Sequence, residues 1–173
     1  MKKLLLSIIV STSLFACSTQ SAKSEKQPIG FDMSGGEGRT DLYGGNPANV
    51  EIIEKFFKAH NDRDTATIRS LEASENLKIY TPEGNVVTSA DSNIKNLSTW
   101  FASNNPKWKI NFSAANSYTD KSGKLNEWVT TGAQVTQTID GKEVKYNQYF
   151  DVNLVNGKIQ RMFVTERKMT DGE

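Results

Sequence analysis

The chain has 173 residues, with 21 Lys and Arg, 20 Asp and Glu, one His and one Cys. This length suits one domain, and the near-neutral charge lacks the basic excess of a nucleic-acid-binding surface, so no nucleic acid partner is expected. Structural zinc sites use about four Cys or His ligands and catalytic sites about three protein ligands. A single His and a single Cys therefore exclude a His-rich or Cys-rich metal site, and we expect no metal and no cofactor.

The N-terminus has the composition of an export signal. Lys2 and Lys3 are followed by the apolar residues 4–16 and then by Cys17, the only cysteine. This stretch is shorter than the about 20 residues that cross a bilayer, but it fits the apolar core of a secretory signal. Leu14-Phe15-Ala16-Cys17 resembles the bacterial lipobox, with an aromatic second residue where a small or aliphatic one is usual.

The lipobox resemblance implies cleavage before Cys17 and acylation of its thiol, for example with palmitate. Residues 1–16 are then a signal peptide, and Cys17 anchors the exported lipoprotein to a membrane of the cell envelope. The periplasmic side of the outer membrane is the default location. Loss of Lys2 and Lys3 changes the net charge from +1 to −1. A plain secretory signal or a buried cysteine is the alternative interpretation.

Residues 17–45 are predicted to be a flexible tether. The segment is rich in Ser and Gly and its apolar groups are scattered, so it cannot bury enough apolar surface to offset the entropy lost on ordering. Its glycines do not form a phosphate-binding loop, because no Lys-Ser/Thr pair follows Ser34-Gly35-Gly36-Glu37-Gly38 and no strand precedes it. Phe31 and Tyr43 are candidates for packing onto the folded part.

Three helices are predicted after the tether. Asn46-Pro47 is a favourable helix start, and apolar residues at helical spacing predict an amphipathic helix as far as His60. Asp64 is expected to cap a second, shorter helix. Ser89 is expected to begin a third helix, which Pro106 ends.

The other elements are predicted to be strands. A Pro-Glu-Gly-Asn turn joins two short strands at residues 77–81 and 86–88. Trp108, Ile110 and Phe112 alternate with polar residues, as in a strand with one buried face. Three further strands, joined at the hairpin signals Asp140-Gly141 and Asn156-Gly157, are predicted over residues 125–139, 144–154 and 159–165.

Helices followed by long antiparallel strands predict an α+β domain over residues 46–169, with a short tail at 170–173. The helices are expected to cover one face of a strongly curved, mainly antiparallel sheet.

The order of elements resembles the nuclear transport factor 2-like fold, also called SnoaL-like or ketosteroid-isomerase-like. The matching segments are FFKAHNDRD at residues 56–64, IYTPEG at residues 79–84 and Asn156-Gly157-Lys158-Ile159. The resemblance covers about residues 47–167 and implies a cone with a pocket between sheet and helices. Proteins of this fold include isomerases, dehydratases, epoxide hydrolases, noncatalytic binders and dimerising scaffolds, so the resemblance is specific for fold and weak for function.

The resemblance places the catalytic positions of the isomerases on unsuitable side chains. In those enzymes a tyrosine and a carboxylic acid hold the oxyanion, and a carboxylate moves the proton. The matching positions are Phe56 for the tyrosine, Thr81 for the base, and Gln148 or Tyr149 for the acid. Phe lacks a hydroxyl, Thr is no base at neutral pH, and neither Gln nor Tyr is a carboxylic acid. Steroid-isomerase chemistry is therefore rejected.

His60 is the remaining candidate for acid–base catalysis. It lies one turn after Phe56, on the face that points to the pocket in the related isomerases, and an ordinary His pKa of about 6.5 suits proton transfer near neutrality. Catalysis would need an orienting carboxylate from Asp62, Asp64 or Asp151. Asp64 is better explained as a helix cap, and Asp151 falls on the other face of its strand. A hydrogen-bonded histidine without a catalytic role is the favoured alternative.

The ligand pocket is expected to draw on both helix and sheet. Arg161 alternates with Ile159 and Phe163 on the last strand, and an inward Arg would favour a carboxylate-bearing ligand; an exposed or ion-paired Arg161 is the favoured alternative. The expected lining residues are Phe56, His60, Tyr80, Thr81, Gln148, Phe150 and Arg161.

The three tryptophans receive different assignments. Trp100 and Trp108 adjoin regular apolar patterns, so core positions are expected. Trp128 shares its strand face with Thr, Gly and Gln residues, which indicates an exposed or contact surface. Because proteins of the resembling fold often dimerise through the sheet, we expect a homodimer at the face around Trp128.

Three functions follow from these patterns. The favoured one is a lipid-anchored module that binds a small, partly apolar molecule in its cone without catalysis. The alternative is a small-molecule enzyme of proton-transfer or hydrolytic type that uses His60 as base, assisted by water or Tyr149. The third is a dimerising scaffold that uses only its sheet surface.

Overall fold

A computed structural model describes residues 26–34, 38–170 and 172. The predicted signal peptide and Cys17 lie outside these residues. In the described part, no helix combines the length and the hydrophobicity needed to span a membrane.

Helices and strands follow one another in the predicted order, after two additional strands at the N-terminus. Over the described residues the elements are β1 (Gly30–Asp32), β2 (Thr40–Gly44), α1 (Pro47–Asp62), α2 (Thr65–Leu71), β3 (Lys78–Tyr80), β4 (Val86–Val87), α3 (Ala90–Asn104), β5 (Lys107–Thr119), β6 (Leu125–Ile139), β7 (Lys142–Val155) and β8 (Lys158–Lys168).

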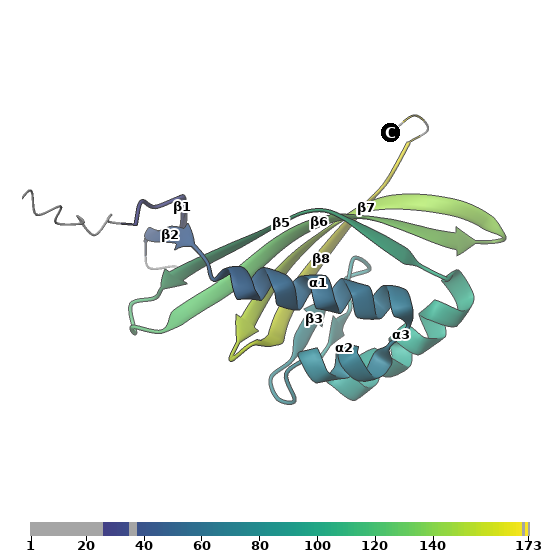
Figure 1. Ribbon diagram of the computed structural model, residues 1–173, viewed down its shortest axis with the longest axis horizontal. Helices are drawn as coiled ribbons and strands as arrows, with labels where there is room; N and C mark the ends of the chain where they lie inside the picture. The colour runs from purple at the N-terminus through teal and green to yellow at the C-terminus, as the bar shows by residue number, and fades with distance from the viewer. Residues whose placement is uncertain (1–25, 35–37, 171, 173) are drawn as a thin grey trace, which may run out of the picture.

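The described strands form one curved sheet with the order β1-β2-β5-β6-β7-β8-β3-β4 (Figure 1). Neighbouring strands are antiparallel, except that β3 runs parallel to β8. Figure 1 shows α1, α2 and α3 together on the side towards which the sheet curves. The predicted α+β architecture, with helices on one face of a mainly antiparallel sheet, is confirmed.

The helix starts follow the predicted capping signals. Asn46, Asp64 and Ser89 each accept a hydrogen bond from a backbone amide in the first turn of α1, α2 and α3. Such bonds satisfy amides that have no partner within the helix. Pro47 is the first residue of α1, a position where its missing N–H costs nothing.

The two predicted tight turns join the long strands. Asp140 and Gly141 have φ values of 51° and 74°, and Asn156 and Gly157 have φ values of 52° and 71°. Two consecutive residues with positive φ give a turn whose twist matches that of the flanking strands. The Asp-Gly and Asn-Gly pairs therefore fix the β6–β7 and β7–β8 connections.

The inner face of the sheet has two parts. At the packed end, aliphatic side chains from α1, α2 and the sheet form a core and are at most 7% exposed. At the cavity end, towards α3, the inner face carries rings, amides and a carboxylate instead. The packed end consists of Ile53, Ile68, Leu71, Val129, Val152, Leu154 and Ile159.

A β-bulge in β5 changes the face on which Phe112 lies. Ile110 and Phe112 pair with consecutive residues of β6, which leaves Asn111 as an extra residue. An extra residue reverses the alternation of the residues beyond it. The prediction that Phe112 shares the buried face of Trp108 was wrong, because Phe112 lies on the outer face and is 48% exposed.

A second bulge acts in the same way in β8. Ile159 and Arg161 pair with consecutive residues of β7, which leaves Gln160 as the extra residue. Ile159 and Met162 are therefore both buried on the inner face, whereas Arg161 is exposed on the outer face. The expected placement of Arg161 in the pocket was wrong for this reason.

Part of the predicted tether belongs to the sheet. Strand β2 pairs with β1 and with the end of β5, so the tether prediction was wrong over residues 30–32 and 40–44. The Gly45 amide donates to the Ala115 carbonyl at 2.9 Å, and a Cβ on Gly45 would lie 2.8 Å from the Asn116 nitrogen. Main-chain hydrogen bonds order this segment, since Phe31 is half exposed and Tyr43 only partly buried.

Candidate functional site

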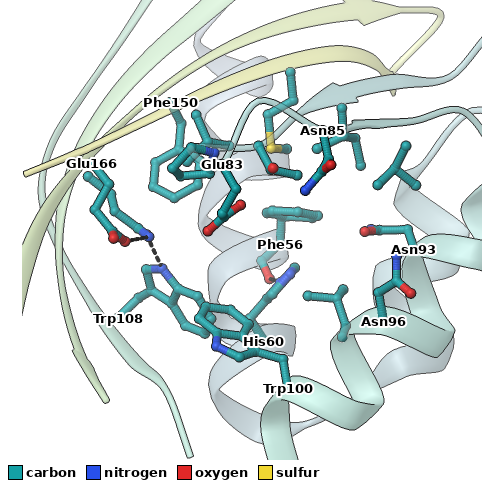
Figure 2. Close-up of a pocket in the computed structure, with 18 of the residues that line it drawn as sticks. Phe56, His60, Glu83, Asn85, Asn93, Asn96, Trp100, Trp108, Phe150 and Glu166 are labelled. Carbon is teal, nitrogen blue, oxygen red and sulfur yellow. Dashed lines mark hydrogen bonds between the residues drawn. The ribbon is translucent and has the colours of Figure 1, made fainter. Parts of the chain in front are cut away.

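A cavity of about 500 Å³ lies at the cavity end of the domain (Figure 2). Its walls come from α1, α3, the β3–β4 hairpin and the inner face of the sheet. The helices contribute Phe56, Phe57, His60, Asn93, Asn96, Leu97 and Trp100; the hairpin contributes Ile79, Thr81, Pro82, Glu83, Asn85, Val86 and Val87; the sheet contributes Trp108, Gln137, Gln148, Phe150, Met162, Val164 and Glu166.

The end of α1 is fixed against the start of β5 by Asn61. Its side-chain amide donates to the Trp108 carbonyl at 2.8 Å, and its side-chain oxygen accepts from the Trp108 amide at 2.8 Å. This pair of bonds places the Trp108 ring beside His60, with ring centroids 5.4 Å apart. The Trp100 ring packs edge to face against the Trp108 ring, with ring centroids 5.3 Å apart. The aromatic wall is therefore positioned by backbone contacts rather than by ring packing alone.

A chain of hydrogen bonds crosses the sheet side of the cavity. The Trp108 indole N–H donates to Gln148 Oε1 at 2.8 Å, and Gln148 Nε2 donates to Glu166 Oε2 at 2.7 Å. Burial raises the pKa of Glu166 and the negative charge of Glu83 raises it further, whereas the bond from Gln148 lowers it; the net pKa is above the ordinary value. The chain fixes the orientation of the Gln148 amide, because both of its ends are used.

His60 is buried and electrically neutral at neutral pH. Its Nδ1 lies 2.8 Å from the Phe56 carbonyl oxygen, and since a carbonyl only accepts, Nδ1 carries the proton and Nε2 carries a lone pair. Burial lowers the pKa of His60 to about 4, opposed by the Phe56 hydrogen bond and assisted by the nearby Arg63 charge.

The three acids proposed to orient His60 are engaged elsewhere. Asp62 pairs with Lys58 one helical turn away. Asp64 caps α2, as predicted. Asp151 accepts a hydrogen bond from the Thr130 hydroxyl at 2.9 Å on the outer side of the sheet. The His60 Nδ1–H therefore donates to a carbonyl oxygen and not to a carboxylate.

A second buried acid lies behind the cavity wall. Glu72 accepts a hydrogen bond from the Asn93 side chain, and Asn93 lines the cavity. Burial raises the pKa of Glu72 to about 7, although the bond from Asn93 and the charge of Arg69 lower it. Its Oε2 is buried without a hydrogen-bond partner among the described residues. Glu72 thus orients Asn93 from behind without touching the cavity itself.

Five of the seven predicted lining residues lie on the wall. These are Phe56, His60, Thr81, Gln148 and Phe150. The pocket placement of Tyr80 was wrong: side chains alternate along a strand, so Tyr80 points outward between inward Ile79 and Thr81. Its ring stacks on Phe163 with centroids 4.6 Å apart.

The choice between Gln148 and Tyr149 is resolved by the same alternation. Gln148 faces the cavity and is 5% exposed, whereas Tyr149 lies on the outer face and is 52% exposed. The position matching the isomerase acid is therefore an amide that is already bonded on both sides. Tyr149 has no access to the cavity as an assisting group.

Several wall residues had not been predicted. Trp100 and Trp108 are part of the cavity wall as well as of the buried cluster. Glu166 was missed although it continues the inward alternation of Met162 and Val164, because the predicted strand ended at residue 165. Glu83 lies in a turn, where no periodic pattern indicates the direction of a side chain. Asn96 and Asn85 complete the polar part of the wall.

Metal ligands are not grouped in the described part of the chain. No cluster of three or more His, Cys, Asp or Glu side chains is found there.

No protein-family profile and no curated protein sequence matches the chain. Solved structures do. An LEH-like epoxide hydrolase from M. tuberculosis shares 16% identity and a TM-score of 0.54, over 69% of this chain and 82% of that one. SalBIII, an epoxide hydrolase/cyclase-like enzyme of pyran ring formation in the polyether salinomycin, shares 18% identity and a TM-score of 0.56, over 70% and 92%.

A third solved structure has the same fold. A protein with a ketosteroid isomerase-like fold from Catenulispora acidiphila, solved in complex with trimethylamine, shares 14% identity and a TM-score of 0.53, over 66% of this chain and 83% of that one. The chain has the nuclear transport factor 2-like fold. At these identities the likeness establishes the fold alone, and the cavity of this nuclear transport factor 2-like domain must be interpreted from its own residues.

Proposed function

We propose that this nuclear transport factor 2-like domain binds a small, partly apolar molecule in its cavity without transforming it. The observation that supports the proposal is the wall itself. Of its 21 lining residues 12 are aromatic or aliphatic and nine are polar, and the cavity has a volume of about 500 Å³. Concave sites of this size and composition are typical of small-molecule binding. The Catenulispora protein of the same fold was itself solved with a small molecule, trimethylamine.

The alternative is an enzyme that uses His60 as a base. An efficient base has a pKa near the operating pH, whereas burial holds the pKa of His60 at about 4. Its Nδ1–H is bound to a carbonyl, which does not stabilise the protonated ring as a carboxylate would. Both features favour a structural role for His60, and they support binding over proton transfer.

Native mass spectrometry of the protein purified from its own envelope tests the proposal. We expect a retained small molecule that is lost in Leu97→Trp, because Leu97 lines the cavity and the larger ring fills it. Lys95→Trp is the matched control, since Lys95 is exposed on the same helix. Equal retention in both variants, or no retained molecule in the wild type, would contradict the proposal. Turnover of the retained molecule that His60→Ala abolishes would favour the enzyme instead.

We also propose that Cys17 carries a lipid that holds the domain at the cell envelope. The support is the sequence pattern of a basic start, a short apolar stretch and a small residue before the cysteine. Metabolic labelling with palmitate and detergent-phase partitioning test it. The wild type should be labelled and partition into detergent, and Cys17→Ser should do neither. Labelling of Cys17→Ser would count against the anchor.

A homodimer through the outer face of the sheet is a third proposal. Phe112, Tyr149 and Phe163 are exposed on this face, and Trp128 stacks on Phe163 with centroids 6.3 Å apart. Adjacent exposed rings are typical of contact surfaces. Sedimentation velocity should show a dimer that Phe163→Ser dissociates and Lys55→Ser, on the solvent side of α1, does not. A monomeric wild type at high concentration would rule the dimer out.

A further inference from the structure

The charged side chains at the cavity are acidic. Glu83, in the β3–β4 turn, and Glu166, near the end of β8, line the cavity, and no Lys or Arg lines it in the described part of the chain. The two carboxylates are close enough to interact. Burial is the larger cause of the raised pKa of Glu166, and the negative charge of Glu83 raises this pKa further. Figure 2 shows both on the same side of the cavity.

Two polar atoms of the wall have no hydrogen-bond partner among the described residues, and one of them, Thr81 Oγ1, is fully buried. His60 is 5% exposed and uses its Nδ1–H for the Phe56 carbonyl, so the Nε2 lone pair has no partner among the described residues. Thr81 Oγ1 is buried and is likewise without a partner in that part of the chain. A buried polar atom such as Thr81 Oγ1 is normally paired. A ligand N–H group can donate to Thr81 Oγ1 or to the His60 Nε2 lone pair.

The remaining wall suits an apolar body next to a positive charge. Phe56, Trp100 and Trp108 supply aromatic surface to the cavity. Aromatic faces attract a cation within about 6 Å of the ring centroid. An anionic group would meet two like charges with no basic side chain of the described wall to compensate them, which is unfavourable.

We infer that the cavity selects a cationic amine attached to an apolar body. The ammonium group lies between Glu83 and Glu166, and the apolar body lies among the aromatic side chains. This inference names the chemical class of the ligand and rests on the proposed binding function. It does not depend on the identity of the natural molecule, so simple probes of matched shape test it.

Three probes with the same carbon skeleton separate charge from shape. Phenylbutylamine, phenylbutanol and phenylbutyrate are cationic, neutral and anionic at neutral pH. Isothermal titration of the full domain should give the order amine, alcohol, acid, with the amine about tenfold tighter than the alcohol. Raising the salt concentration from about 0.05 M to about 0.5 M should reduce this advantage, because salt screens partly exposed charges.

Two isosteric substitutions remove the charges without removing the side chains. Glu83→Gln and Glu166→Gln should each reduce the preference for the amine, and the double variant should bind amine and alcohol about equally. Both side chains are exposed enough for the variants to fold, and Gln at position 166 still accepts from Gln148. Glu51→Gln is the matched control, since Glu51 is exposed on α1 and absent from the wall.

The outcomes separate this inference from the function on which it rests. A preference for the amine that is lost in the double variant and kept in Glu51→Gln supports it. Alcohol that binds as tightly as amine, and is excluded by Leu97→Trp, overturns the charge selectivity and leaves the binding function standing. A preference that persists in the double variant also overturns it. Failure of all three probes to bind contradicts both.

Discussion

The packed end and the cavity end of the domain are built from the same elements. Strand β7 gives Val152 and Leu154 to the packed end and Gln148 to the cavity. Helix α1 likewise places Ile53 in the packed end and His60 at the cavity. The backbone is continuous through both, so the side chains decide which part of the cone is filled.

The difference teaches how one sheet can hold both a core and a binding site. Branched aliphatic side chains interlock at the packed end, where Ile53 and Ile159 are completely buried, as expected of close packing. Rings and amides at the cavity end are held by directed contacts, such as the bond from Trp108 to Gln148. These hydrogen bonds fix the orientation of the side chains, so the side chains line the cavity and do not turn into it.

The largest expected effect is the difference in stability lost when a side chain is truncated to alanine at the packed end and at the cavity end. Ile53→Ala should lower the free energy of unfolding by about 3–4 kcal/mol, because it leaves a void among close-packed neighbours. Leu97→Ala should cost about 1 kcal/mol or less, since Leu97 already faces open space. Urea unfolding measures both values. Equal costs would mean that the cavity end is packed as tightly as the core.

The next effect concerns the buried acid behind the cavity wall. The pKa of Glu72 is raised from 4.5 to about 7, so the folded state binds this proton more tightly than the unfolded state does. Its contribution to stability is therefore fully present below about pH 4.5 and is lost as the pH rises through about 7. Glu72→Gln removes this dependence: relative to wild type, it should gain up to about 3 kcal/mol between pH 4.5 and pH 8.

Unfolding experiments on wild type and Glu72→Gln across this pH range measure the difference in their free energies of unfolding. The contributions of all other titrating groups cancel in this difference. Glu75→Gln is the control, because Glu75 is exposed in the loop that follows Glu72. A Glu72→Gln difference that stays constant with pH would show that the carboxyl is not held in its neutral form by burial.

A smaller effect is expected from breaking the hydrogen-bond chain at the cavity. Gln148→Leu leaves the Trp108 indole N–H without its acceptor and should cost about 1–2 kcal/mol. The pKa of Glu166 should rise further, because Gln148 supplies the bond that lowers it. Unfolding and carboxyl-carbon NMR titration report the two changes. Gln134→Leu, on the outer face, should leave the Glu166 titration unchanged.

The smallest effect is expected on the outer face. Tyr149→Ser should change the free energy of unfolding of the dilute protein by less than about 0.5 kcal/mol, because the side chain is 52% exposed. Phe150→Ser, one residue along, should cost several times more, since Phe150 is buried against Phe57 with ring centroids 4.9 Å apart. Similar costs at the two positions would contradict the assignment of the two faces.

Local signals in the sequence predicted most of the fold. The caps at Asn46, Asp64 and Ser89 and the turns at Asp140-Gly141 and Asn156-Gly157 depend on a few neighbouring residues. Such features are legible without knowledge of the tertiary structure. The order of elements and the α+β class follow from them.

The errors arose where a distant contact decides the outcome. A bulge is set by pairing with the neighbouring strand, so the outward positions of Phe112 and Arg161 left no local signal. Strand β2 is ordered by pairing with the edge of β5. The glycine-rich sequence of this segment carries no local signal of that pairing. Glu83 reaches the cavity from a turn. By contrast, the inward position of Glu166 followed from alternation that needed only one more residue.

The two bulges also divide their strands into independent segments. On β5, Trp108 faces the cavity before the bulge, and Ser113 faces inward after it, where it bonds to Thr131 at 2.8 Å. On β8, Ile159 precedes the bulge in the core and Met162 follows it at the cavity wall. Each bulge thus reverses the in–out alternation of side chains along its strand. The residues on one side of a bulge can therefore change to suit a different ligand, while the inward and outward positions on the other side stay the same.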